Sequence, residues 1–293
     1  MNRTAGEKVF DVLNFFVLGL FALITFYPFY YIIIYSFSDP ELAGKGIFLL
    51  PAGFSLINYN RIFQQSDIMH AAFISLARTF LGTLLAVSCC SMFAYGIIKE
   101  VLPLRKFMYR ATILIMYISI GIIPVFITYK ALGLRNNFLV YILPNLVAPF
   151  LIVLLKTYFE QLPLEIEESA MIDGAGYFRI FIQIILPLSK PILATVAIFH
   201  AVYLWNSYWD NLYFANSPKL MTLPLLLFTY LNQNMANAVT NRNALSSGRR
   251  VVKITPTSIR MTITVITTLP VLFVYPFLQR YFLKGLLIGS VKG

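Results

Sequence analysis

The chain carries one distinctive polar segment, which begins Glu167-Glu168-Ser169-Ala170-Met171-Ile172-Asp173-Gly174-Ala175-Gly176. After seven intervening residues, 177–183, it ends Ile184-Ile185-Leu186-Pro187. The surrounding stretch, 160–190, holds five of the twelve carboxylates in the chain. Pro163 favours a helix start, and acidic residues in the first turn suit the positive end of a helix dipole. Gly174 can then end or bend the helix, because glycine reaches backbone angles that other residues avoid. The segment therefore predicts two short helices joined at a glycine.

Apolar runs dominate the sequence on both sides of this segment. The 293 residues are 59% apolar and 12% charged, whereas soluble domains are roughly 45–50% apolar and about 25% charged. A helix needs about 20 mostly apolar residues to cross a bilayer, and runs of that length recur. We predict an all-α, polytopic membrane protein that is one transmembrane domain with about six spans. The predicted spans are 9–37, 70–98, 107–129, 137–159, 188–214 and 259–282, and the fourth is interrupted by Pro144 and Pro149.

The distribution of Lys and Arg predicts the orientation of the spans, because basic residues favour the cytoplasmic side of short connections. With the N-terminus inside, twelve of them fall in cytoplasmic segments and four in the two shorter outer connections. The fifth connection, 215–258, and its flank add six on the outside and weaken this bias. We expect both termini and the 160–187 loop in the cytoplasm. The 215–258 connection is expected to protrude outside, as a solvated linker or a docking surface.

Signatures of catalysis are absent from the sequence. The two histidines, His70 and His200, form no HExxH pattern, and neither a G-x-S-x-G elbow nor a GxxxxGK[ST] phosphate loop occurs. Cys89 and Cys90 lie in an apolar run and are expected to pack as small apolar residues. The net charge of +11 is spread over the connections, so nucleic acid is not an expected partner. We therefore expect no enzyme activity, metal or cofactor in this chain.

The polar segment resembles the cytoplasmic coupling loop of permeases from ATP-binding-cassette (ABC) importers. That pattern is Glu-Ala-Ala, three residues, Gly, nine residues, Ile, any residue and Leu-Pro, and both gaps fit here. The matching residues are Glu168, Ser169, Ala170, Gly174, Ile184, Leu186 and Pro187. Ser169 is the one departure, a small residue in place of Ala. The run from Ile172 to Ala175 is typical of the carbohydrate branch of the family.

The resemblance extends over nearly the whole chain, because six spans with short termini match the maltose-importer type. In particular the chain resembles the branch that imports oligosaccharides derived from polysaccharides, such as the second permease of an alginate importer. In that family the loop forms a coupling helix that fits a groove on the nucleotide-binding subunit. The residues implied in coupling are Glu167, Glu168, Ser169, Ala170, Asp173, Gly174, Ile184, Leu186 and Pro187.

The same resemblance implies a set of partners and a location. The expected partners are a second homologous permease, two ATP-binding subunits that use ATP and Mg, and an extracytoplasmic solute-binding protein. The expected cargo is a sugar or oligosaccharide. The expected location is the lipid of a bacterial cytoplasmic (inner) membrane.

The outer half of the predicted fifth span is unusually polar and aromatic. Aromatic faces stack on sugar rings and amides bond to hydroxyls, which suits a carbohydrate path; an interfacial aromatic belt is the alternative. Arg78 in the second span either lines a path for an acidic sugar or snorkels outward from the first helical turns. The candidate path residues are Arg78, Tyr203, Trp205, Asn206, Trp209 and Asn211.

Two other classes of membrane protein were weighed against an importer subunit. A self-contained secondary transporter would couple to ions through buried carboxylates or broken helices. Only Asp210 and Asp11 lie within the predicted spans, and no inverted repeat is evident. A membrane enzyme would need a convergent catalytic set, which the sequence does not display.

Overall fold

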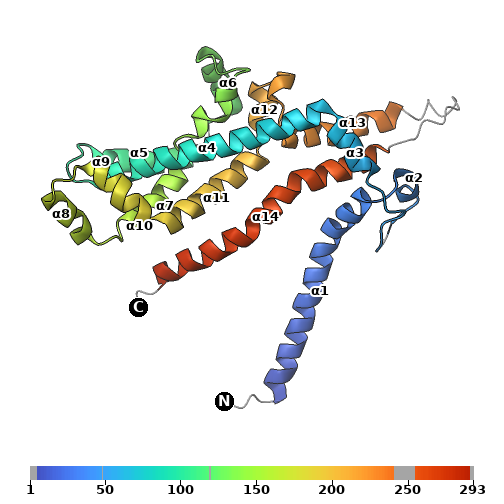
Figure 1. Cartoon of the computed structure of the whole chain (residues 1–293), viewed down its shortest axis with the longest axis horizontal. Coiled ribbons are helices and arrows are strands. Elements are labelled where there is room, and N and C mark those ends of the chain that lie inside the picture. The colour runs from blue at the N-terminus through green and yellow to red at the C-terminus, as the bar shows by residue number, and fades with distance from the viewer. Residues whose placement is uncertain (1–4, 48, 119, 241–254, 291–293) are drawn as a thin grey trace. The chain divides into compact units, whose positions relative to one another are not determined.

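The computed structural model describes residues 5–47, 49–118, 120–240 and 255–290, and the described residues confirm the all-α prediction. The only extended pairing in these ranges is an isolated antiparallel bridge between Ser38 and Phe54. The chain divides into two compact units (Figure 1). One comprises residues up to 68 together with 229–269, and the other comprises 69–228 and the residues from 270 onward.

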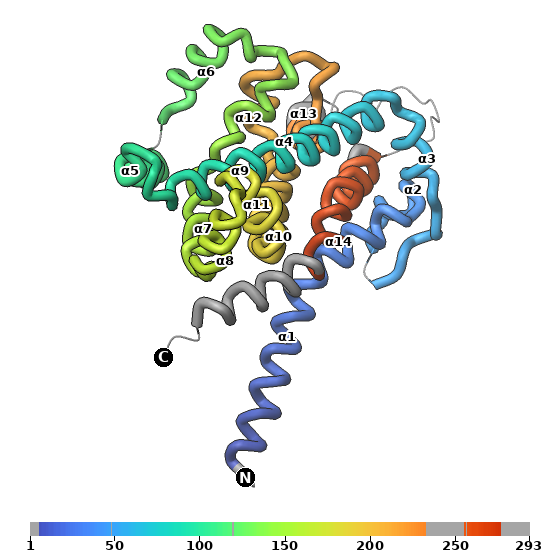
Figure 2. Tube along the Cα trace, turned by 60° about the vertical axis from the view of Figure 1, so that its left-hand side comes forward, coloured from blue at the N-terminus to red at the C-terminus, as the bar shows by residue number. Residues whose placement is uncertain are grey.

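The larger unit is organised around a long helix, α4 (Ser66–Ile98). The elements that follow α4 are α5 (Arg105–Tyr117), α6 (Ile122–Ala131), η1 (Phe138–Tyr141), η2 (Leu143–Asn145), α7 (Pro149–Phe159), α8 (Leu164–Ile172), α9 (Tyr177–Ile180), η3 (Phe181–Ile185), α10 (Leu186–Leu188), α11 (Lys190–Asn206), α12 (Trp209–Phe214), η4 (Pro218–Leu220) and α13 (Leu223–Thr240). In both whole-chain views α11 runs alongside α4 (Figures 1 and 2). The C-terminal half of α4 packs with α7, η3 and α11 around the buried residues Cys90, Ile152 and Val196. Cys90 thus lies in an apolar core, as predicted for it.

The smaller unit contains α1 (Ala5–Ser36), α2 (Pro40–Ala43), α3 (Ile57–Gln64), the part of α13 from Thr229 onward and the first part of α14 (Pro256–Ser290). The Asp39 carboxylate caps α2 by accepting from the N–H groups of Glu41 and Leu42. The buried Asn58 amide donates to the carbonyls of Ser36 and Ser38, and so fixes α3 to the end of α1. Most of α1 leaves its apolar side chains exposed, as expected of a helix that faces lipid or another apolar protein surface.

Three helical segments among the described residues are long and apolar enough to cross a membrane: Gly6–Ser36, Ser66–Ile98 and Thr257–Pro276. They coincide with the predicted first, second and sixth spans. Two bent pairs meet the same criterion together, Phe138–Asn145 with Pro149–Phe159 at 43°, and Tyr177–Leu188 with Lys190–Asn206 at 82°. The first bend lies where Pro144 and Pro149 were predicted to interrupt the fourth span.

The predicted third span, 107–129, is not one helix. α5 ends at Tyr117 with Ile118 in an extended conformation, and α6 begins after Gly121, which is also extended. Pro124 lies in the first turn of α6, where a missing N–H breaks no helical hydrogen bond. β-branched residues and a glycine at the junction favour an extended backbone, so the apolar run continues while the helix does not.

The predicted outer connection, 215–258, is also not a plain linker. η4 and α13 occupy part of it, and Leu223, Leu225 and Leu226 at the start of α13 are buried. The Leu223 N–H donates to the Ser75 hydroxyl of α4 at 2.9 Å, which joins this helix start to the core of the larger unit. The apolar run Leu223–Phe228 explains the packing. Residues 241–254, with most of the basic residues assigned to this connection, lie outside the described residues.

Candidate functional site: a coupling helix and a polar pocket

The polar segment forms two short helices that meet at a glycine, as predicted. α8 begins after Pro163, carries Glu165 and Glu167 in its first turn, and ends at Ile172. Gly174 has a φ of +80°. The Ala175 N–H donates to the Ala170 carbonyl at 2.9 Å, and the Gly174 N–H to the Met171 carbonyl at 3.0 Å. This is the Schellman arrangement, which satisfies the last carbonyls of a helix when a glycine follows it in the left-handed conformation.

The residues of α8 divide between an outward and an inward face. Glu168, Ser169 and Asp173 are exposed, and so is Ile172, at 86%. Exposed large apolar side chains at the surface indicate a contact surface for another molecule. By contrast Glu167 is buried and forms an ion pair with Lys99, directly after α4. Of the residues implied in coupling, Glu167 therefore contacts its own chain.

The remaining positions of the pattern belong to the core and to a bend. Ala170, Ile184 and Leu186 pack against the cluster that includes Tyr95 and Phe181. Pro187 is exposed and lies in the first turn of α10, where proline is well tolerated. The 82° bend follows at Ser189, between α10 and α11. The pattern therefore combines an exposed helix with the packing that holds it.

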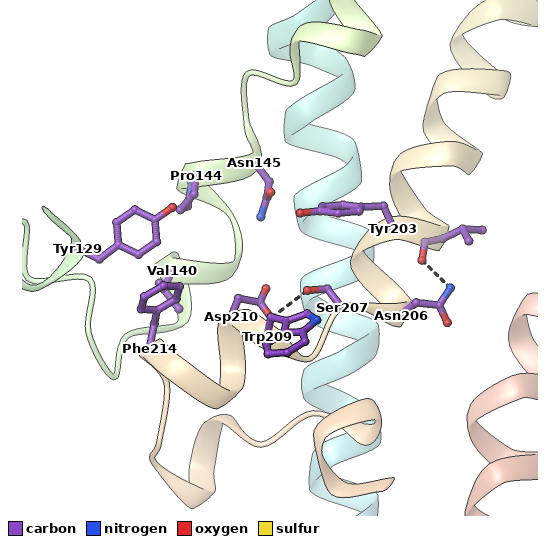
Figure 3. Close-up of a pocket in the computed structure, with 11 residues that line it drawn as sticks. Tyr129, Val140, Pro144, Asn145, Tyr203, Asn206, Ser207, Trp209, Asp210 and Phe214 are labelled. Carbon is purple, nitrogen blue, oxygen red and sulfur yellow. Dashed lines mark hydrogen bonds between the residues drawn. The ribbon is translucent and has the colours of Figure 1, made fainter. Parts of the chain in front are cut away.

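The predicted fifth span is interrupted in its C-terminal half, and a pocket lies at the interruption. α11 ends at Asn206, Ser207 is extended, and α12 begins at Trp209. The cavity has a volume of about 490 Å³. Its walls are Tyr129, Val140, Pro144, Asn145, Val202, Tyr203, Asn206, Ser207, Trp209, Asp210 and Phe214 (Figure 3). We call this cavity the polar pocket.

Three polar groups of the polar pocket converge from different elements. The Tyr203 hydroxyl, the Asn145 amide and the Asp210 carboxylate point into the same space (Figure 3). Trp209 is half exposed, and its ring stacks on that of Tyr213 with centroids 5.6 Å apart. Aromatic faces beside amide and hydroxyl groups are the chemistry that recognises sugar rings. Tyr203, Asn206 and Trp209 are thus the predicted path residues that line the pocket.

Arg78 does not snorkel; it is buried, with 1% exposure, and paired. Its guanidinium donates to both carboxylate oxygens of Asp210, at 3.2 and 2.7 Å, and to the Ser207 carbonyl at 3.3 Å. The guanidinium carbon lies 4.6 Å from the centroid of the Tyr141 ring. A charge at membrane depth is stabilised by a buried partner, and the sequence prediction lacked this partner, 132 residues away. Arg78 therefore lies behind the pocket wall and holds the break between α11 and α12.

Two further predicted path residues belong to the packing. Trp205 is buried outside the pocket. Asn211 is fully buried, donates to the Ala215 carbonyl at 2.7 Å and accepts from the N–H of Thr222 at 2.8 Å. Asp210 and Asn145 were not among the predicted site residues. Their signals were a lone carboxylate in an apolar span and an amide beside Pro144 at a helix break.

Among the described residues, no three His, Cys, Asp or Glu side chains lie close enough together to bind a metal ion. A polytopic helical fold, an exposed helix on a Gly-ended loop and a polar pocket beside broken helices define a membrane transport subunit. Residues 88–288 match the family of binding-protein-dependent transport system inner membrane components. The chain belongs to this family.

Several curated relatives align along the entire chain. Protein LplC of Bacillus subtilis is 38% identical, covering 100% of this chain and 98% of the relative. The polygalacturonan/rhamnogalacturonan transport system permease protein YtcP of the same organism is 36% identical over 98% and 99%. The arabinooligosaccharides transport system permease protein AraQ of Halalkalibacterium halodurans is 30% identical over 98% and 99%. The names of YtcP and AraQ describe transport permeases rather than enzymes, and a self-contained secondary transporter is not favoured.

A solved structure agrees with this assignment. It is the crystal structure of a bacterial ABC transporter involved in the import of the acidic polysaccharide alginate. One of its chains matches with a TM-score of 0.81 and 27% identity, covering 96% of this chain and 99% of that chain. The predicted ABC importer permease fold is therefore confirmed.

Proposed function

We propose that this chain is the permease subunit of an ABC importer for oligosaccharides, with both termini in the cytoplasm. A second permease completes the path, two separate subunits hydrolyse ATP with Mg²⁺, and a solute-binding protein delivers the cargo outside. The observation that carries the proposal is α8, a short helix exposed on one face, anchored through Glu167 on the other and ended by Gly174. Family membership and relatives that align end to end support it.

The chemistry of the exposed face of α8 fits a protein groove. Leu164 and Ile172 are 69% and 86% exposed, and Glu168 adds a negative charge between them. Apolar side chains in a pocket supply binding energy, while a charged residue at the rim supplies orientation and specificity. The proposed partner surface is a groove on the ATP-binding subunit that carries a basic residue opposite Glu168.

The proposed cargo is an oligosaccharide derived from a polysaccharide. The names of YtcP and AraQ refer to such substrates in those proteins, and the polar pocket supports the extension to this chain. Tyr203 and Trp209 line a cavity with Asn145 and Asp210, which supports a sugar path over an aromatic belt that only faces lipid headgroups. A volume of about 490 Å³ suits one or two sugar rings.

Copurification tests the docking step. The tagged chain, coexpressed with the genes beside its own, should retain an ATP-binding subunit in detergent. E168K should reduce the retained subunit by about tenfold, because it places like charges together at the dock. The matched control is E41K, the same charge change on the exposed helix α2, which should retain the wild-type amount. Equal retention by E168K and wild type would contradict docking through α8.

Labelling of single cysteines tests the orientation. With Cys89 and Cys90 replaced by Ala, I172C should react only with a membrane-permeant maleimide in intact cells, and G44C should react with an impermeant one. Asn241, an attractive outer position on the predicted topology, lies outside the described residues. Labelling of I172C by the impermeant reagent in intact cells would place the loop on the wrong side for an ATP-binding subunit.

A further inference from the structure

The C-terminal end of α4 contacts the coupling helix through a largely buried ion pair. Lys99 follows α4 directly, and its ammonium group pairs with the Glu167 carboxylate of α8. The two side chains are 15% and 10% exposed. The same ammonium lies 4.2 Å from the centroid of the Tyr95 ring, one turn earlier in α4. A cation between a carboxylate and an aromatic face has two favourable partners and little access to solvent.

The same end of α4 also holds the second half of the coupling loop. The Tyr95 ring stacks on Phe181 of η3, with centroids 5.1 Å apart and planes at 28°. Ala170 of α8 and Ala175 after it pack against the cluster to which both rings belong. One end of one helix therefore contacts the coupling loop both before and after Gly174.

The other end of α4 is fixed at the polar pocket. Arg78 lies 21 residues before Lys99, which corresponds to about 31 Å along a helix. It pairs with Asp210 in the pocket wall and donates to the Ser207 carbonyl at the break between α11 and α12. α4 is continuous from Ser66 to Ile98, and its sequence contains no proline. Ion pairs therefore join an unbroken helix to the coupling loop at one end and to the pocket at the other.

We propose that α4 transmits the movement of the coupling helix to the polar pocket, and that the Lys99–Glu167 pair is the positioning contact that makes α8 and α4 move as one body. The covalent route from α8 to α11 passes through Gly174 and an 82° bend, both of which can flex. The ion pair provides a direct route. This proposal rests on the proposed function, since it assumes that α8 is moved by an ATP-binding subunit.

Distances between spin labels test whether the two helices move together. One nitroxide is placed at I166C of α8, away from the proposed docking face, and the other at F80C, where side chains are 38% and 71% exposed, with Cys89 and Cys90 replaced by Ala. The complete importer in nanodiscs is measured without nucleotide and after trapping with Mg²⁺, ADP and vanadate. The wild-type distance should be narrowly distributed and equal in both states. K99Q and E167Q should each broaden it, and their ATP hydrolysis should fall about tenfold.

Exchanging the two charges distinguishes an effect of the ion pair from effects of the two individual side chains. The double variant K99E/E167K restores opposite charges and should recover the narrow distribution and at least half of the hydrolysis rate. The matched control is K156Q, because Lys156 pairs with Glu160 at the C-terminal cap of its own helix, α7, and also lies over a tyrosine ring, that of Tyr109 at 4.3 Å. K156Q should leave the distance unchanged. Narrow distances in K99Q and E167Q, or a reversed pair as broad as the single variants, would overturn the proposal.

The outcome can be distinguished from a failure of the proposed function. The ion pair lies within this chain, so the distance distribution of the purified full chain in nanodiscs reports on it without any partner. If no ATP-binding subunit copurifies but K99Q still broadens the distance, then the importer assignment fails while the Lys99 contact stands. If the ATP-binding subunit copurifies but K99Q leaves the spin-label distance distribution unchanged, only the proposed role of α4 is refuted.

Discussion

The two ends of α4 use different chemistry to hold their neighbours. At the pocket end, a planar guanidinium makes three hydrogen bonds to Asp210 and Ser207, lies over the Tyr141 ring and is almost fully buried. At the end next to α8, the Lys99 ammonium contacts one carboxylate and the Tyr95 ring, and its side chain remains 15% exposed. Arginine fixes the geometry of its partner in two directions, whereas lysine acts as a point charge that tolerates rotation.

This difference indicates which end of α4 is held rigidly to its neighbours and which end has an adjustable contact. Breaking a buried ion pair by removing one partner costs about 3–5 kcal/mol, because it leaves an uncompensated charge. Pairs with access to water cost less, since solvent screens the charge that remains. The pocket end of α4 should therefore be a rigid part of the fold. The end at Lys99 should hold α8 firmly enough to transmit movement, while its point-charge contact tolerates small rotations of the two side chains.

The largest effect is expected from disrupting the pocket end. R78M leaves the Asp210 carboxylate, which is 16% exposed in the pocket wall, without its cation, and it should destabilise the larger unit by up to about 3 kcal/mol. Thermal unfolding in detergent, followed by size-exclusion chromatography with fluorescence detection, should show a clear fall in midpoint and a lower yield. R78K should lie between R78M and wild type, because an ammonium replaces only one of the two hydrogen bonds to the carboxylate.

A double variant provides the control for Arg78. R78M/D210L removes both charges, so it should be more stable than R78M alone. If R78M alone unfolds at the wild-type temperature, then the pair is not a fixed point of the fold. In that case the contrast between the two ends of α4 disappears.

The second effect compares two asparagines at the pocket end. Asn211 is buried and supports the turn from α12 to α13 by bonding with Ala215 and Thr222, so N211A should cost about 1–3 kcal/mol of stability through unpaired polar groups. Asn206 lines the pocket at the exposed end of α11, and N206A should leave stability within about 0.5 kcal/mol. Sugar uptake by N206A should fall while its unfolding midpoint stays unchanged. A fall in both quantities would assign Asn206 to the packing instead.

Sequence reasoning succeeded where the structure depends on local backbone chemistry. Pro163 and Gly174 set the start and end of α8 through angles that proline and glycine impose or permit, so two short helices joined at a glycine were predictable. The pocket was only half predictable. Whether Arg78 faces lipid, cargo or a partner depends on Asp210, which is distant in sequence, and no pattern within either span encodes their proximity. The break after Tyr117 was missed because hydropathy registers apolar length and not helical continuity.

The third effect concerns the turn that follows α8. Gly174 has a φ of +80° and no neighbouring atom within 4 Å of where a Cβ would lie, so substitution meets backbone strain and no clash. G174V should therefore weaken the loop by about 1–2 kcal/mol. Coupling should fail as helix α8 loses its cap, while membrane insertion is retained. The matched control is G176V, since Gly176 has an ordinary φ of −74° and the same open surroundings. ATP hydrolysis stimulated by the binding protein should fall in G174V and persist in G176V.

The smallest effect is expected from a Lys–Glu pair that resembles the Lys99 contact on the lysine side but differs from it in the exposure and position of the carboxylate. Lys156 is 14% exposed, lies 4.3 Å from the centroid of the Tyr109 ring and pairs with Glu160 at 2.6 Å. However, Glu160 is 49% exposed and is the C-terminal cap of α7, so the pair connects α7 only to its own C-terminal end.

Such i, i+4 pairs contribute about 0.3–0.5 kcal/mol, and E160Q should lower the unfolding midpoint by less than the measurement error. E167Q has the same chemical change but removes the counter-ion of a partly buried lysine that joins two elements, so it should give a clear fall in midpoint. If E160Q and E167Q shift the midpoint equally, then burial and connectivity add nothing to the Lys99 contact. α4 would then hold the coupling helix by apolar packing alone.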